Sequence, residues 1–174
     1  MHYQTLQSKF FIDLNAILPL IKHWTNLQET IVFTNGCFDI LHRGHIDYLY
    51  RAADLGTKLV VGLNSDSSVR MLKGNHRPIQ NQIDRLHILA ALSCVSAVVV
   101  FDEPTPRRLI EGISPNVLVK GSDYDVADIV GANWVVESGG TVQTIDYLVG
   151  CSTSAIEQKI IDMHQKNLNI SKKP

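Results

Sequence analysis

Two histidines and a glycine stand together in the segment His42-Arg43-Gly44-His45, just after an apolar run and a glycine-containing turn. His42 and His45 are three residues apart, so on a helix they share one face and can both donate hydrogen bonds to one anion. Gly44 lacks the Cβ that would keep a phosphate away from the backbone. A helix that begins here also offers free N–H groups and the positive end of its dipole. The spacing therefore predicts a phosphate-binding site.

Two other interpretations fit the same four residues. Zinc sites on helices usually space their histidines four apart and need a third ligand, for which only Cys37 is near in sequence. The histidines could also be exposed side chains at an ordinary helix start. Phosphate binding is the interpretation that uses both histidines and the glycine.

The elements that would position this site alternate between strand and helix patterns. β-branched apolar runs predict strands at 30–34, 58–63, 97–101, 116–120 and 141–145. Helical patterns lie at 10–26, 44–55, 82–92, 105–113, 125–136 and 153–163. Nearly continuous apolar strands are typical of a parallel sheet covered on both faces, so we predict a doubly wound α/β fold. In such a fold, ligands bind outside the carboxyl ends of the strands.

Further polar groups follow the predicted strands or precede the last helix. Asn64, Ser65 and Asp66 come directly after the second strand, where they could serve as a helix cap or line a pocket. Lys120 to Asp123 end the fourth strand in the same way. Ser154 and Glu157 have capping-box spacing, yet the hydroxyls of residues 152–154 could also hold a pyrophosphate. Each group allows a structural and a functional interpretation.

The blocks T-N-G-C-F-D-I-L-H-R-G-H (34–45), V-G-L-N-S-D (61–66), L-K-G-x-x-R-P (72–78), L-V-K-G-x-D-Y (118–124) and G-C-S-T-S (150–154) stand in this order. Together they resemble the cytidylyltransferase-like nucleotidyltransferases, whose hallmark is His-x-Gly-His. More narrowly, they are similar to the adenylyltransferase domain of bacterial heptose-phosphate enzymes of lipopolysaccharide synthesis. The resemblance covers about residues 30–160 and implies a Rossmann-like nucleotidyltransferase fold.

The resemblance also implies roles for individual residues. Catalytic roles at the transferred phosphate fall on His42, His45 and Lys73. Nucleotide contacts fall on Thr34, Asn35, Gly36, Phe38, Gly44, Arg85, Lys120, Gly121, Ser152, Thr153 and Ser154. Acceptor contacts fall on Asn64, Asp66 and Asp123. Some cytidylyltransferases carry an arginine where this chain has Cys151. We therefore expect Mg²⁺ that binds together with ATP to neutralise the terminal phosphates. We expect no metal held by protein side chains alone.

The expected reaction is transfer of AMP from ATP to a sugar 1-phosphate, in particular a heptose 1-phosphate, with release of pyrophosphate. A phosphate monoester is already anionic at neutral pH and needs no general base, so the enzyme must mainly position groups and compensate charge. The alternatives are a CTP-dependent transferase acting on an acceptor such as glycerol 3-phosphate, and a non-catalytic nucleotide-binding module. The sequence does not decide the base, the acceptor or its anomer.

Composition limits the remaining function classes. The 174 residues are 45% apolar with a net charge of −1, which describes one ordinary domain and disfavours binding to nucleic acid or to an anionic membrane. Three cysteines and no secretory signal or long apolar stretch favour a cytoplasmic protein. We divide the chain into an N-terminal helical extension (1–29), a nucleotidyltransferase domain (30–163) and a polar tail (164–174). We also expect a homodimer, and a separate sugar kinase upstream.

Overall fold

Strands and helices alternate along the chain, and their bounds fix where the loops at the carboxyl edge lie. The computed structural model describes residues 1–123, 125 and 128–170. In these residues the strands are β1 (Phe10–Phe11), β2 (Ile31–Gly36), β3 (Lys58–Asn64), β4 (Ala97–Phe101), β5 (Val117–Gly121) and β6 (Thr141–Ile145). The helices are α1 (His2–Gln7), α2 (Leu14–Asn26), α3 (Arg43–Ala53), α4 (Asp66–Lys73), α5 (Gln82–Ala90), α6 (Arg107–Ile113), α7 (Ala132–Glu137) and α8 (Thr153–Ile170). None of them combines the length and apolar character that a membrane span requires.

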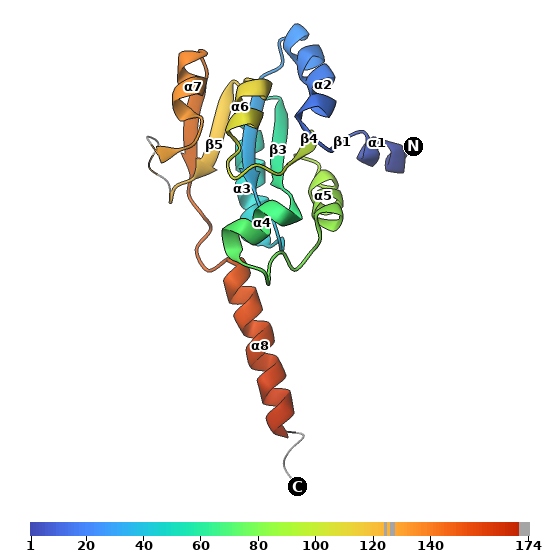
Figure 1. Ribbon diagram of the computed structural model, residues 1–174, viewed down its shortest axis with the longest axis vertical. Helices are drawn as coiled ribbons and strands as arrows, with labels where there is room; N and C mark the ends of the chain where they lie inside the picture. Colours follow the sequence, from blue (N-terminus) through green and yellow to red (C-terminus); the bar gives the residue numbers. More distant parts are fainter. Residues whose placement is uncertain (124, 126–127, 171–174) are drawn as a thin grey trace.

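The strands described form one parallel sheet in the order β1-β4-β3-β2-β5-β6. From β2 the chain first builds outward through β3 and β4, and later returns to place β5 on the other side of β2 (Figure 1). This reversal confirms the predicted doubly wound α/β fold. It also puts a topological switch point between β2 and β5.

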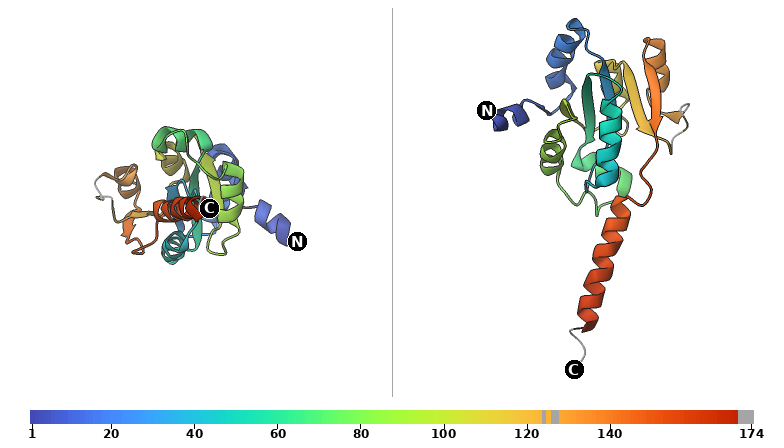
Figure 2. Two further views of the ribbon diagram at one scale, coloured as in Figure 1. Left: turned by 90° about the horizontal axis from the view of Figure 1, so that it is seen from below. Right: turned by 180° about the vertical axis from the view of Figure 1, so that it is seen from behind.

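Helices cover both faces of the sheet, because alternate residues of each strand point to opposite sides. Val60 of β3 belongs to a buried cluster that also holds residues of α2, α6 and α7. Its neighbour Val61 belongs to a second cluster, which holds residues of α3 and α5. Figure 2 shows these two groups of helices on opposite faces. The sheet is therefore buried on both sides, as its continuous apolar strands predicted.

The segment 10–26, predicted as one helix, contains a strand and a shorter helix. Phe10 and Phe11 form β1, which pairs with β4 at the edge of the sheet. The helix α2 begins only after Asp13, whose carboxylate accepts a hydrogen bond from the N–H of Ala16 at 2.8 Å. A carboxylate in this position caps a helix and so sets its start. The prediction was wrong here because the apolar spacing alone did not show the cap.

Helix α2 contains a proline in its interior. Pro19 does not break the helix, which continues through it to Asn26. Ile17, Ile21 and Trp24 of this helix are buried against the sheet and α6. Burial of that apolar face outweighs the lost backbone hydrogen bond. Residues 10–26 thus extend the sheet and cover one of its faces.

Three other elements differ from the prediction. The helix expected at 125–136 is present only as α7, which begins at Ala132. Gly131, directly before it, has φ +84° and so ends any earlier helical turn. Residues 126 and 127 lie outside the described part. The polar segment after β3 forms α4, which was not predicted. The last helix continues past 163 to Ile170, since no glycine or proline interrupts it. Helix therefore occupies 164–170 of the predicted tail, and 171–174 lie outside the described residues.

Candidate active site

The carboxyl ends of β2 and β5 form the crevice at the switch point. The register between these strands covers two pairs, Val32 with Val117 and Phe33 with Leu118, whereas β2 and β3 pair over six residues. Beyond those two pairs a side chain bridges the strands: the Lys120 ammonium donates a hydrogen bond to the Asn35 amide oxygen. Ligands bind in crevices of this kind because parallel strands diverge there and leave room between their loops.

Helix α3 begins directly at this crevice, with its predicted histidines at its first turn. His42 is the N-cap residue, and its carbonyl accepts from the backbone N–H of His45 at 2.9 Å. The His42 side chain makes no capping hydrogen bond. The two imidazole rings stack with centroids 3.9 Å apart, and the Phe38 ring meets His45 edge-on at 5.4 Å. Phe38 therefore packs against His45 and fixes the orientation of the histidine pair. This packing is a different role from the predicted nucleotide contact of Phe38.

Burial keeps both imidazoles in the neutral form. It lowers the pKa of His42, and it lowers the pKa of His45 to about 4, with the charges of His42 and Lys73 adding to the effect. The Nδ1 atoms of both rings are buried, and neither has a hydrogen-bond partner among the described residues. A neutral imidazole donates one N–H, so this pair can bind an anion without acting as an acid. A bound polyanion would raise both pKa values.

The N-terminus of α8 lies against the N-terminus of α3. A Cβ placed on Gly44 would stand 3.0 Å from the Cβ of Cys151, the residue just before the Ser152-Thr153 pair. The Thr153 hydroxyl makes a weak hydrogen bond, at 3.5 Å, to the carbonyl of Ile40 in the loop before α3. Two helix N-termini, each favouring negative charge, therefore converge on one place.

The hydroxyls at the start of α8 differ in what they do. Ser152 caps the helix by accepting from the Ala155 N–H at 3.1 Å. The capping box that the spacing of Ser154 and Glu157 allowed does not form, because α8 begins earlier, with Ser152 as its cap, and Glu157 pairs with Arg77. Ser154 is exposed on the first turn. The capping oxygen of Ser152 is already partly used within the helix.

Two lysines bring positive charge to this region from different sides. Lys73 is the last residue of α4, and it is exposed. Its charge lowers the pKa of His45, which places it near the histidine pair. Lys120 is largely buried, and burial lowers its pKa to about 8, although Asp123 and Cys37 partly oppose this shift. Asp123 is thus an exposed neighbour of the Lys120 ammonium.

Arg85, predicted as a nucleotide contact, is buried and fully used inside the protein. Its side chain donates to the carbonyls of Gln80 (3.0 Å), Cys37 (2.6 Å) and Asn64 (2.8 Å), and to the Asp66 carboxylate (2.8 Å). Only 1% of the residue is exposed. In this structure Arg85 holds the ends of β2 and β3 together, and its contact with a nucleotide stays a prediction.

The predicted acceptor contacts on β3 and α4 are also engaged within the chain. Asn64 is buried and donates from its side-chain amide to the Ser68 hydroxyl at 2.9 Å. Asp66 holds Arg85, as described above. Ser65 caps α4 by accepting from the Ser68 N–H at 3.0 Å. In this structure the capping interpretation of the segment 64–66 describes the observed contacts.

Three further predicted nucleotide contacts, Thr34, Gly36 and Gly121, pack against neighbouring side chains. Thr34 is completely buried, and its hydroxyl lies 2.7 Å from the Tyr48 hydroxyl, so it faces the interior and offers nothing to a phosphate. Gly36 leaves room for the Phe38 ring, which would be 3.1 Å from an added Cβ. Gly121 lies directly under Tyr147, whose hydroxyl would overlap any Cβ there. Both glycines are required by close packing.

A buried carboxylate, Asp39, is the residue that the sequence-based prediction missed. It accepts hydrogen bonds from the N–H groups of Ile79 and Gln80 and from Arg77. Burial alone would raise the pKa of Asp39, but these donors hold it below its ordinary value. An acidic residue between apolar neighbours in the segment 38–41 was the available signal, since such a residue needs partners when buried.

A separate cavity of about 430 Å³ lies at the far end of the carboxyl edge, beside Phe101 and Asp102. Ser65 lines it, but none of the residues predicted to have catalytic, nucleotide or acceptor roles does. The converging helix N-termini, histidines and lysines all lie at the β2–β5 crevice instead. That crevice is therefore the candidate site.

A known protein family matches most of the chain. The model of the cytidylyltransferase-like family matches residues 33–161, a range that contains most of β2, both helix N-termini and both lysines. The chain belongs to the cytidylyltransferase-like family. The resemblance found in the sequence motifs is thereby confirmed.

Relatives of this cytidylyltransferase-like chain include much longer proteins. It is 54% identical over 149 residues to the bifunctional protein HldE of Geobacter metallireducens, covering 86% of this chain and 30% of the relative. It is 52% identical over 138 residues to the bifunctional protein HldE of Syntrophotalea carbinolica, covering 79% and 28%. The chain thus spans less than a third of the length of these relatives.

Solved structures show the same fold. A lipopolysaccharide core biosynthesis protein from Thermoplasma volcanium is 28% identical, with a TM-score of 0.56, covering 69% of this chain and 97% of that one. A pantoate-beta-alanine ligase from Francisella tularensis has a TM-score of 0.58 at 14% identity, covering 85% and 75%, and shows a likeness of fold alone. The cytidylyltransferase-like fold is therefore supported by sequence and by structure.

Proposed function

We propose that this chain is a nucleotidyltransferase that transfers AMP from ATP to a sugar 1-phosphate, specifically a heptose 1-phosphate, and releases pyrophosphate. The observation that carries the proposal is the convergence of the α3 and α8 N-termini around a neutral histidine pair, with Lys73 and Lys120 nearby. Similarity to the bifunctional HldE proteins and to a lipopolysaccharide core biosynthesis protein supports the heptose acceptor.

The chemistry needs charge compensation more than proton transfer. The attacking phosphate monoester carries its own negative charge, so no general base is required. His42 and His45 would donate to the triphosphate, and their neutral state suits a donor that does not exchange protons during the reaction. Lys73 would neutralise charge on the attacking side. Ser152 and Thr153, at the start of α8, would hold the departing pyrophosphate.

Mg²⁺ is proposed to enter together with ATP. Two carboxylates near the crevice already have partners: the buried Asp39 binds Arg77 and two backbone N–H groups, and the half-buried Asp66 binds Arg85. They therefore do not fit a cage of protein ligands, whereas phosphate oxygens and water suit Mg²⁺ well. The ion would add positive charge at the triphosphate, and the steps proposed for the side chains above do not pass through it.

Partners and location extend the same proposal. A sugar 1-phosphate is the product of a sugar kinase reaction, which we propose takes place before this one. We also propose that two copies of the chain associate and that the protein works in the cytoplasm, where ATP is available. Sedimentation of the purified chain tests the dimer, which a monomeric mass at micromolar concentration would contradict.

Pyrophosphate release tests the reaction itself. The chain would be incubated with each of the four nucleoside triphosphates, with and without a panel of sugar phosphates and glycerol 3-phosphate. Pyrophosphate release is expected with the pair ATP and heptose 1-phosphate and with no other pair. Release with CTP and glycerol 3-phosphate would point to the sister activity, and no release with any pair would indicate a nucleotide-binding module.

A further inference from the structure

Arg77 lies between two carboxylates that come from distant parts of the chain. Its Nη1 atom is 2.8 Å from a carboxylate oxygen of Asp39, in the loop that follows β2. Its Nη2 atom is hydrogen-bonded to the carboxylate of Glu157, in the second turn of α8. The side chains of Arg77 and Glu157 are 14% and 40% exposed, so water screens the Glu157 contact more than the buried Asp39 contact. One guanidinium therefore joins the crevice loop to the last helix.

The Asp39 side of this link is rigid. Asp39 is 3% exposed and holds the N–H groups of Ile79, at 2.8 Å, and Gln80, at 2.9 Å, as well as Arg77. Its pKa lies below the ordinary value, so the group stays ionised at neutral pH. These contacts fix the loop before α5 to the loop before α3, and they hold the Arg77 side chain in place.

The same loop begins directly after Lys73, the last residue of α4. The N–H of Arg77 donates to the carbonyl of Gly74 at 3.1 Å, closing a turn directly after the lysine. Because the two carboxylates fix the Arg77 side chain, they also restrain the turn that ends α4. The link therefore restrains the backbone at the end of α4, where Lys73 lies.

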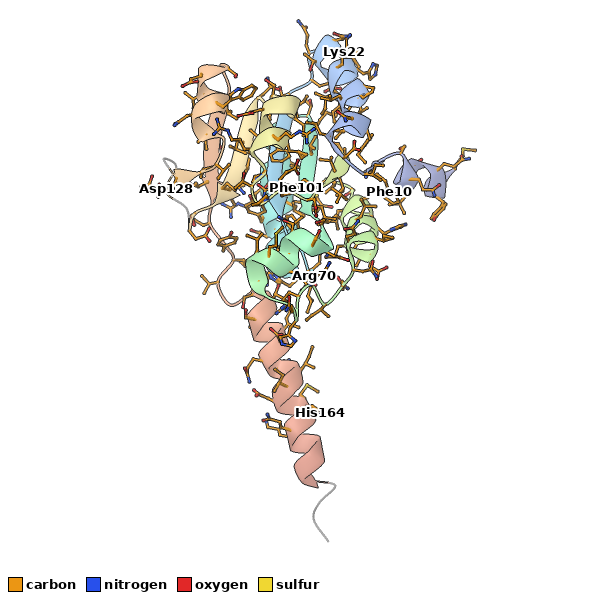
Figure 3. All side chains as sticks on the ribbon, viewed as in Figure 1. Phe10, Lys22, Arg70, Phe101, Asp128 and His164 are labelled. Atoms are coloured by element: carbon orange, nitrogen blue, oxygen red, sulfur yellow. The ribbon has the colours of Figure 1, made fainter. Side chains whose placement is uncertain are left out.

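The α8 side of the link has few other contacts with the body. Figure 1 shows α8 leaving the carboxyl edge of the sheet and running away from it, and Figure 3 shows His164 well beyond the other helices. Residues 158–166 are all exposed. Near its start, the helix touches the body through Cys151 beside Gly44, the weak Thr153 bond, and the Glu157 pair. Of these, the ion pair is the strongest polar contact.

We propose that Arg77 and Glu157 form a positioning pair that sets how close the first turn of α8 stands to the first turn of α3. The triphosphate site of the proposed function lies across these two turns, so the inference rests on that function for its catalytic consequence. Arg77 suits this task because its planar fork binds two carboxylates at once, which the single ammonium of a lysine does not do with fixed geometry.

The test removes the charge of Glu157 and keeps its shape. In Glu157→Gln, backbone amide hydrogen exchange in residues 153–158 should accelerate about tenfold, as expected when a charge-assisted hydrogen bond is lost. The KM for ATP should rise by about the same factor, with kcat changed less, since the two walls of the site are no longer held together. Asp162→Asn is the matched control, because Asp162 is an exposed acid on α8 that binds only Gln158 among its described contacts.

A double-mutant cycle separates positioning from a general loss of structure. Arg77→Lys should keep a contact with Asp39 but release Glu157, so adding Glu157→Gln to it should cause little further change in exchange or in KM. Independent, additive effects of the two substitutions would overturn the proposal. So would exchange at residues 153–158 that is the same in Glu157→Gln and Asp162→Asn.

The exchange measurement needs no catalysis, which keeps the two proposals apart. If the wild-type chain releases no pyrophosphate with any substrate pair, the proposed function fails. Faster exchange in Glu157→Gln would still support the positioning pair, and unchanged exchange would reject it whatever the activity.

Discussion

Gly44 of α3 and Cys151 before α8 are in direct contact: a Cβ on Gly44 would stand 3.0 Å from the Cβ of Cys151 and 3.1 Å from the His42 ring. These distances are shorter than most Cβ contacts, so any side chain at position 44 must push one of these groups away. The contact therefore sets the closest approach of the two helix N-termini.

Gly44→Ala should weaken the proposed activity without unfolding the protein. The added methyl displaces Cys151 or His42 by a few tenths of an ångström, and we expect kcat/KM for pyrophosphate release to fall about tenfold or more. Alanine favours a helix over glycine, so the free energy of unfolding should change by less than about 1 kcal/mol. Adding Cys151→Gly should restore part of the activity. Full activity in the single variant would contradict this account.

His45→Ala should abolish most turnover while the fold is retained. Loss of one preorganised donor to the transferred phosphates typically costs about a hundredfold in kcat. Steady-state pyrophosphate release would measure it, and circular dichroism would check the fold. His164→Ala, an exposed histidine on α8, is the control and should behave as wild type. Near-wild-type kcat in His45→Ala would remove His45 from the proposed site.

Stability should depend on pH through His45. Its pKa is about 4 in the folded protein against an ordinary value of 6.5, so below pH 6.5 the unfolded chain binds a proton that the folded chain does not. The free energy of unfolding should therefore fall between pH 6.5 and 4, by at most about 1.4 kcal/mol per pH unit. Urea unfolding at pH 7 and pH 5 should show a smaller drop in His45→Gln than in wild type. Equal drops would argue against burial of this imidazole.

The proposed activity should decline at alkaline pH, because Lys120 loses its positive charge there. Its pKa of about 8 means that the free enzyme loses this positive charge above pH 8, so kcat/KM for the anionic nucleotide should decline there. Lys120→Arg keeps the charge and should move the decline to higher pH. Cys37→Ser removes a group that raises the Lys120 pKa, so the decline should persist and move to slightly lower pH. A flat profile to pH 9.5 in wild type would show that Lys120 does not assist binding.

Arg85→Met should lower stability, because it leaves Asp66 and three carbonyls without their buried donor. Leaving one buried acceptor without its donor typically costs about 1–3 kcal/mol, and more than one acceptor loses its donor here. Arg108→Met, at an exposed arginine paired with Glu103, should cost less than about 1 kcal/mol. Urea unfolding compares them. If Arg85→Met keeps its stability and raises only the KM for ATP, Arg85 would be a nucleotide contact after all.

Local patterns in the sequence were sufficient for much of the fold. The strands at 97–101 and 141–145 were predicted with their observed bounds, because β-branched apolar runs between turn residues leave few alternatives. The parallel sheet followed from strands that are apolar on both faces. The missed elements were those set by one capping residue, such as Ser65 before α4 and Asp13 before α2. Capping depends on a side chain bending back to the backbone, which apolar periodicity does not reveal.

The sequence by itself determined the residue types that can handle phosphate, since His42, Gly44, His45 and the hydroxyls at 152–153 are local groups whose spacing along a helix start is fixed. Only the tertiary structure decided which predicted polar groups face the crevice. Arg85, Asn64 and Thr34 turned out to be buried with internal partners, while Asp39 and Arg77 proved to join segments more than thirty residues apart. A polar side chain near a site can bind a ligand or satisfy its neighbours, and that choice depends on contacts between distant segments that sequence spacing does not contain.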